Sequence, residues 1–305
     1  MLKVQSAPVT AVPAKIRSAV ERDSAWLFVL PALVLSASVV AFPVIATVVF
    51  SFTDWNGLGT PHFIGLDNFR ALFGEARFWI ALSNNFIFTS VFVTLPMIVA
   101  LIASALLLII KFGRTFFQVV FFLPVTIATI ILAQIWRGMI YSPVTGVVGW
   151  LQGLGLAVSN PLADPSTSLY GVLLVDMWHW WGYLTVIYFA ALRQVDVSLI
   201  EAAFMDGASY IATFRFILLP MIMPTILFML LMTVIWSFRV FDWVFILTEG
   251  GPGFSSEVLG TLAYKTAFQQ MAVGRASAYS LVMSILGLVA ISIYLRVQYK
   301  SEKLS

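Results

Sequence analysis

The chain has 305 residues, of which 61% are hydrophobic and only 10% are charged, and its formal net charge is +3. Because ordinary soluble domains are about 25% charged, this composition excludes a soluble globular protein. The chain has no cysteine, which excludes disulfides, thiolate catalysis and metal sites built from cysteine.

Apolar segments follow one another along the chain, and each reaches or exceeds the roughly 20 residues that a helix needs to cross a bilayer. They run from Trp26 to Thr53, Phe78 to Ile110, Thr115 to Trp136, Leu169 to Leu192, Phe216 to Phe238 and Ala276 to Leu295. The first is too long for a cleavable secretory signal, so we expect it to be retained. The sequence therefore predicts an all-α, polytopic membrane protein with six transmembrane helices.

We expect one transmembrane domain over residues 25–300, an N-terminal tail over 1–24 and a C-terminal tail over 301–305. Six spans place both termini on one side, together with the connections at 111–115 and 193–220. That side carries most of the basic residues: Lys3, Lys15, Arg17, Arg22, Lys111, Arg114, Arg193, Arg215, Arg296, Lys300 and Lys303. By the positive-inside rule, both tails and the 193–220 connection are predicted to be cytoplasmic.

The 193–220 connection is the most polar segment between two spans. Residues 197–206 are good helix formers, and Gly207 suits a left-handed C-terminal cap. Ser209 can cap a second helix that runs to about Leu218, where Pro220 is expected to end it. We predict a helix–turn–helix on the membrane surface. From these residues alone, a plain amphipathic connector is an equally good reading.

The run Glu201-Ala202-Ala203-x-x-Asp206-Gly207 resembles the EAA loop of binding-protein-dependent ABC importer permeases. Three further pieces resemble the sugar-permease branch, and they occur in the family's order: Phe63 to Phe69, Leu123-Pro124, and Thr248 to Pro252. The resemblance implies the type I ABC importer permease fold. It also implies that the loop docks on a cytoplasmic ATPase subunit through Glu201, Ala202, Ala203, Met205, Asp206 and Gly207.

The resemblance also implies residues that line a substrate pathway. In the fourth span these are Trp180 and Tyr183, for which an interfacial aromatic belt is the alternative. The fifth span contributes Trp236, Ser237, Arg239 and Val240, and the third contributes Val125 and Thr129. The role of Arg239 has two interpretations. Its guanidinium can form an ion pair with Asp242, or it can donate two hydrogen bonds to the substrate. At position 182, where relatives often have Pro, this chain has Gly, which leaves the helix geometry open.

The expected function is that of a permease subunit in an ATP-driven importer of a saccharide or glycoside, located in a bacterial inner membrane. No Lys lies in a G-x-x-x-x-G-K-[ST] motif, so ATP is expected to bind partner subunits. Expected partners are a second homologous permease, two ATP-binding cassette subunits, a periplasmic solute-binding protein and membrane lipid. We expect no cofactor, no metal and no nucleic acid.

Other function classes fit the sequence less well. The same machinery could import glycerol-3-phosphate or another anionic sugar derivative, with Arg239 as the anion contact. An ion-gradient transporter predicts several buried acidic residues and an inverted repeat, whereas only Asp176 and Asp242 are candidates. An intramembrane enzyme needs either a nucleophile paired with a base or a set of metal ligands. The chain has two His and no Cys, which argues against such a site.

Overall fold

The computed structural model describes residues 25–302, so the predicted tail at 1–24 and residues 303–305 lie outside the described range. Within that range the regular structure is helical, with no strand and one isolated bridge between Thr53 and Phe63. The expected all-α class is confirmed. The last helix extends to Glu302, two residues beyond the predicted end of the transmembrane domain.

The chain divides into two compact units, residues 1–49 and 50–305. The first unit contains α2 (Ala25–Ser36), the π-helical turn η1 (Ala37–Ala41) and most of α3 (Phe42–Phe50). Residues 29–50 are long and apolar enough to cross a membrane. Their large side chains, among them Leu35, Val40 and Phe42, are exposed within the described chain. A helix that is apolar all round suits a membrane span, whose surroundings are lipid or other helices.

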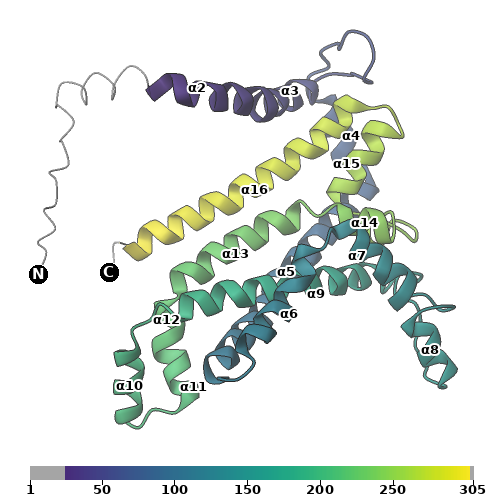
Figure 1. The fold of residues 1–305 in the computed structure, drawn as a ribbon. Helices are drawn as coiled ribbons and strands as arrows, with labels where there is room; N and C mark the ends of the chain where they lie inside the picture. Colours follow the sequence, from purple (N-terminus) through teal and green to yellow (C-terminus); the bar gives the residue numbers. More distant parts are fainter. Residues whose placement is uncertain (1–24, 303–305) are drawn as a thin grey trace, which may run out of the picture. The chain divides into compact units, whose positions relative to one another are not determined.

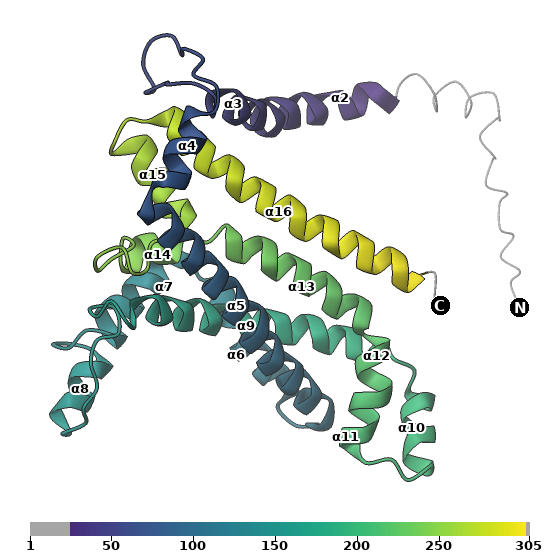
Figure 2. The same ribbon diagram turned by 180° about the vertical axis from the view of Figure 1, so that it is seen from behind.

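In the second unit, four long helices lie side by side. The helix α5 packs against α9, and α6 and α13 flank that pair (Figures 1 and 2). The helices of this unit are α4 (Asp67–Gly74), α5 (Ala76–Ile109), α6 (Arg114–Thr126), α7 (Thr129–Ile135), η2 (Trp136–Ile140), α8 (Val147–Gly153), α9 (Ser168–Leu192), α10 (Val197–Met205), α11 (Tyr210–Thr213), η3 (Phe214–Leu218), α12 (Leu219–Met221), α13 (Met223–Phe238), α14 (Asp242–Leu247), α15 (Leu259–Phe268) and α16 (Val273–Glu302).

The short helices gather at the two ends of this unit. Both views place α10 and α11 at one end, near the connection from α5 to α6, and α7, α14 and α15 at the other (Figures 1 and 2). The aromatic and polar side chains of α9 and α13 lie between these ends. The fold therefore separates α10 and α11 from the loops at the opposite end of the unit.

The described part of the chain has three straight candidate spans and three bent helix pairs, which together correspond to the six predicted spans. The third predicted span is not straight: α6 and the α7–η2 segment meet at 98° where Ile127 and Ala128 leave the helix. The fifth bends by 70° at Ile222, not at Pro220. Pro220 falls in the first turn of α12, where a proline is tolerated.

The close approach of α6 to α9 explains why position 182 is occupied by glycine. The helix α9 continues through Gly182, and a Cβ there would overlap the backbone carbonyl of Phe121 in α6. The two backbones approach too closely for any residue larger than glycine. Glycine at this position thus permits a continuous α9 to pack tightly against α6.

Candidate functional site

An aromatic cluster connects α9 and α13. The Trp180 and Trp236 rings meet edge to face with centroids 4.2 Å apart, and the Trp180 and Tyr183 rings lie 4.8 Å apart. Tyr183 is also 6.3 Å from Phe122 of α6. The spacing of three residues places Trp180 and Tyr183 on one face of α9. Three of the predicted substrate residues are therefore brought together from two helices.

Three polar atoms in this region are buried without a hydrogen-bond partner within residues 25–302. They are the indole Nε1 of Trp180, Nδ1 of the preceding His179, and the hydroxyl of Tyr188, which packs in the same apolar cluster. Buried polar groups are nearly always hydrogen-bonded, so each exception calls for an explanation. A polar ligand that enters between α9 and α13 is one such explanation, because sugar hydroxyls both donate and accept.

The other predicted substrate residues are more scattered. Ser237 is buried, and its hydroxyl is hydrogen-bonded to Thr89 Oγ1 at 2.9 Å and to the Val234 carbonyl. Val240 is buried in the core around α9 and α14. Val125 and Thr129 lie on either side of the break between α6 and α7. Ser237 and Val240 thus contribute to packing between helices, whereas the partly exposed Val125 and Thr129 border a bend.

Arg239 lies where α13 ends, and its side chain is exposed. The ion pair with Asp242 that the spacing suggested does not form: within the described chain, neither side chain has an oppositely charged group within 4.0 Å. The reason is geometric, because Arg239 to Phe241 leave the helix before α14 begins at Asp242. The i,i+3 rule that favoured the pair holds only on a continuous helix.

Asp176 and His179 were not among the predicted site residues, yet both are buried next to the aromatic cluster. The His179 Nδ1 atom is 4.0 Å from the nearer Asp176 carboxylate oxygen, and the His179 ring is 5.3 Å from that of Trp243. Ionisable residues inside a span usually face a cavity or a partner. Their presence in an otherwise apolar run was the sequence signal for this part of the site.

The second candidate region is the surface hairpin, defined here as α10, Gly207 and α11. The Asp196 carboxylate caps α10 by accepting a hydrogen bond from the Ser198 amide at 2.9 Å, and this contact lowers the pKa of Asp196. Gly207 has φ +82°, and the amides of Gly207 and Ala208 donate to the Phe204 and Ala203 carbonyls. This is a Schellman cap, which requires the left-handed conformation that glycine adopts without strain.

The start of the second helix also follows the prediction. The Ser209 hydroxyl accepts a hydrogen bond from the Ala212 amide at 3.2 Å and so caps α11. The helix then widens into the π-turn η3 and continues as α12 to Met221. The predicted helix–turn–helix is confirmed as a local fold.

Glu201, Ala202, Met205 and Asp206 are exposed residues on one face of α10. Met205 is the most prominent, since 88% of its surface is exposed. Ala203 differs from the sequence prediction, because it is buried at 7% exposure and faces the interior. The small residue that a docking partner can approach closely is therefore Ala202, and Ala203 permits close packing within the chain.

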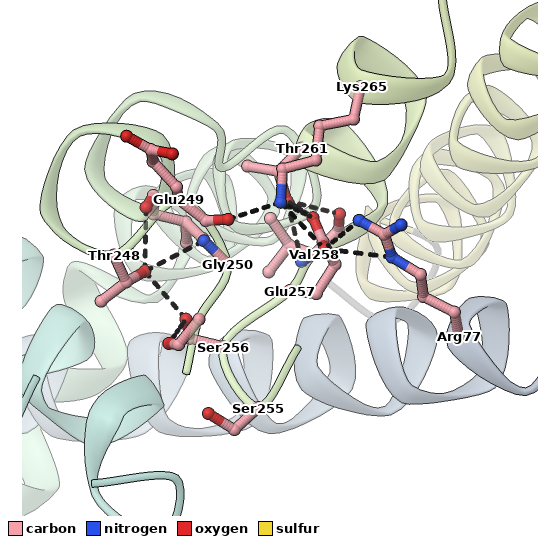
Figure 3. Close-up of polar contacts among 12 residues, drawn as sticks. Arg77, Thr248, Glu249, Gly250, Ser255, Ser256, Glu257, Val258, Thr261 and Lys265 are labelled. Carbon is pink, nitrogen blue, oxygen red and sulfur yellow. Dashed lines mark hydrogen bonds and ion pairs between the residues drawn. The ribbon is translucent and has the colours of Figure 1, made fainter. Parts of the chain in front are cut away.

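The Glu257 network fixes the loop at the opposite end of the unit, residues 248–258. The buried Glu257 carboxylate accepts hydrogen bonds from Arg77 Nη2 at 2.6 Å, Lys265 Nζ at 3.1 Å and Thr261 Oγ1 at 2.7 Å (Figure 3). Asn84 donates to the Ser255 and Glu257 carbonyls. No local sequence pattern predicted this cluster, since Arg77 and Glu257 are 180 residues apart.

Comparison with known proteins identifies the family. The family model described as binding-protein-dependent transport system inner membrane component matches residues 82–302. The chain is 35% identical, over 88% of its length and 92% of the relative's, to a probable starch degradation products transport system permease protein of Thermoanaerobacterium thermosulfurigenes. It is 29% identical, over 91% and 94%, to the trehalose/maltose transport system permease protein of Thermococcus litoralis.

Solved structures agree on the fold. A bacterial ABC transporter involved in the import of the acidic polysaccharide alginate contains a chain that superimposes with a TM-score of 0.81. The superposition covers 95% of this chain and 99% of that one, at 23% sequence identity. At this identity the likeness supports the fold alone.

Proposed function

The chain belongs to the family of binding-protein-dependent transport system inner membrane components, and on this premise we propose that it imports a saccharide or glycoside. It is a multi-pass permease subunit of an ABC importer. Two relatives are named for starch degradation products and for trehalose and maltose, which supports a sugar substrate. The cluster of Trp180, Tyr183 and Trp236 suits such a substrate, because aromatic faces stack on sugar rings while the unpaired Trp180 Nε1 can donate to a hydroxyl.

The observation that carries the proposal is the surface hairpin. Its Schellman cap holds α10 rigidly, and Glu201, Ala202, Met205 and Asp206 stand exposed on one face. A prominent methionine beside a small residue is a surface that a partner pocket can receive. In this proposal the hairpin couples the permease to an ATP-binding subunit, which hydrolyses ATP, and the orientation places both termini in the cytoplasm.

Two further partners complete the proposed assembly. The helix α6 exposes Phe116, Val119 and Leu123 within the described chain, which favours contact with a second, homologous permease in the membrane. A solute-binding protein would deliver the sugar at the opposite end, where the Glu257 network holds the 248–258 loop rigid. Two ATP-binding cassette subunits would then serve the two permeases.

The coupling proposal can be tested by crosslinking, since the chain has no native cysteine. We expect a Met205→Cys variant to crosslink, through a short bismaleimide, to a cysteine in the cleft of the ATPase subunit. An Ala157→Cys variant, exposed in the loop before α9, is the matched control and should not crosslink. The coupling role would be contradicted if cells that carry the Met205→Cys variant take up substrate normally but show no crosslink. Equal crosslinking from position 157 would also contradict it.

A second candidate substrate is an anionic sugar or polyol derivative. It is favoured by Arg239, whose exposed guanidinium lacks an acidic partner within the described chain. If Arg239 binds a substrate anion, Arg239→Ala should lower uptake by roughly 10- to 100-fold, the worth of a charge-assisted hydrogen bond. The Asp242→Asn variant should then change uptake little. Equal losses in both variants, measured with radiolabelled substrate, would favour a neutral sugar and a structural role for Arg239.

A further inference from the structure

A cavity of about 350 Å³ lies between the surface hairpin and the last turns of α5. Its walls are mainly apolar and include Leu108 from α5, Phe204 from α10 and Phe214 from η3. This volume is within the range of pockets that bind small molecules. The cavity is on the side of α10 that faces away from the proposed ATPase contact, since Met205 and Ala202 point outward and Phe204 lines the cavity.

Two polar groups stand out among the apolar residues that line this cavity. Thr213 is 2% exposed, and its buried hydroxyl has no hydrogen-bond partner within residues 25–302. Lys111 is exposed and has no ion pair in the described part of the chain. The neighbouring Arg114 is already engaged, because its guanidinium donates to the Leu108 and Ile110 carbonyls. The cavity thus offers a free cation and a free hydroxyl.

The cavity lies where the chain leaves the membrane. The apolar helix α5 ends at Ile109, and Phe112, directly after Lys111, is 94% exposed. A lysine that follows an apolar span typically extends its ammonium group into the headgroup region. The neighbouring segment η3 is a π-helical turn, a feature that often occurs at functional sites.

We propose that this cavity binds an anionic phospholipid of the cytoplasmic leaflet. An acyl chain lies along the apolar walls, the phosphate is next to Lys111, and the Thr213 hydroxyl donates to an ester or phosphate oxygen. The cavity separates α10 from α5, so a bound lipid supports the inner side of the surface hairpin and fixes its position. This regulatory consequence rests on the proposed coupling function, whereas lipid binding does not.

The test uses the permease complex extracted in mild detergent and examined by native mass spectrometry with added phosphatidylglycerol. We expect a bound phosphatidylglycerol, and we expect Lys111→Ala to weaken its binding roughly fivefold, as the loss of one basic residue near an anionic surface implies. Thr213→Val should also weaken it. Lys111→Arg should retain the lipid, and so should Arg193→Ala, an exposed basic residue outside the cavity.

Two results would overturn the proposal. One is equal lipid retention by wild type, Lys111→Ala and Thr213→Val. The other is displacement of the bound phosphatidylglycerol by inorganic phosphate alone, because this would identify a site for a free anion. Lipid binding is measured independently of transport. If the purified complex lacks an ATPase subunit but the variants bind phosphatidylglycerol as expected, the proposed coupling function is wrong and the lipid site remains supported. If coupled ATPase activity is equal in neutral and anionic nanodiscs, the regulatory consequence fails.

Discussion

Glu257 is a fully buried carboxylate that is in contact with two cations and one hydroxyl (Figure 3). A buried acid is tolerated only when its charge is compensated and its oxygens are hydrogen-bonded. The network joins α5, α15 and the 248–258 loop, and a Cβ on Gly250 would overlap the carboxylate. The charge and the glycine together determine the conformation of this loop.

Removing the charge of Glu257 should therefore be costly. We expect Glu257→Gln to lower the stability of the purified protein by about 3–5 kcal/mol, because the partly buried cations of Arg77 and Lys265 are left without a counter-charge. Thermal and denaturant unfolding in detergent would measure this. The matched control is Asp67→Asn, which removes an exposed pair with Arg70 and should cost less than about 1 kcal/mol. Equal effects of the two variants would contradict the structural role of the network.

At the scale of helices, the close approach of α6 and α9 supports the aromatic cluster. Phe122 of α6 reaches Tyr183 of α9 one residue beyond Gly182, where the two backbones nearly touch. Since α6 is bent away from α7 by 98° after this contact, the position of the bend depends on how α6 is held. The glycine is thus linked to the shape of the proposed substrate pathway.

A methyl group at Gly182 should separate these helices. Gly182→Ala would place a Cβ against the Phe121 carbonyl, and backbone overlap of this kind costs about 1–3 kcal/mol or more. We expect lower stability together with reduced substrate affinity. Gly287→Ala in α16 is the control, because within the described chain no atom beyond the neighbouring backbone of α16 lies within 4 Å of the added Cβ, and helix propensity should make the change neutral or slightly stabilising. A Gly182→Ala protein with unchanged unfolding and uptake would disprove tight contact here.

At the scale of the whole molecule, the distribution of basic residues determines the proposed orientation. The predicted topology places eleven of the 17 basic residues on the cytoplasmic side, and Arg77 and Lys265 on the opposite side. In the structure both of these outer residues pair with the buried Glu257. The positive-inside rule counts Lys and Arg and gives Asp and Glu little weight, so this pairing leaves the proposed orientation unchanged.

The orientation can be measured with single cysteines in this cysteine-free chain. We expect a Phe112→Cys variant, between α5 and α6, to react with a membrane-impermeant thiol reagent only after the inner membrane is permeabilised. A Thr60→Cys variant, exposed in the loop before α4, should react once the reagent reaches the periplasm. The opposite pattern would reverse the orientation and remove the surface hairpin from the cytoplasm.

Features that depend on near neighbours in the chain could be predicted from the amino-acid sequence. Apolar runs identify spans because a helix must be long enough to cross the bilayer, and the caps at Gly207 and Ser209 were predicted because each involves residues within a few positions. Family motifs then located the surface hairpin. These features needed no knowledge of how the helices pack.

The remaining features could not be predicted from the sequence, because they depend on residues far apart in the chain or on where a helix breaks. The pairing of Glu257 with Arg77 spans 180 positions, and Ala203 is buried although the loop pattern indicated exposure. Arg239 and Asp242 have helical spacing, yet the helix ends between them. Hydrophobicity indicates that a segment crosses the membrane, but packing against other helices determines where it bends and which face stays free.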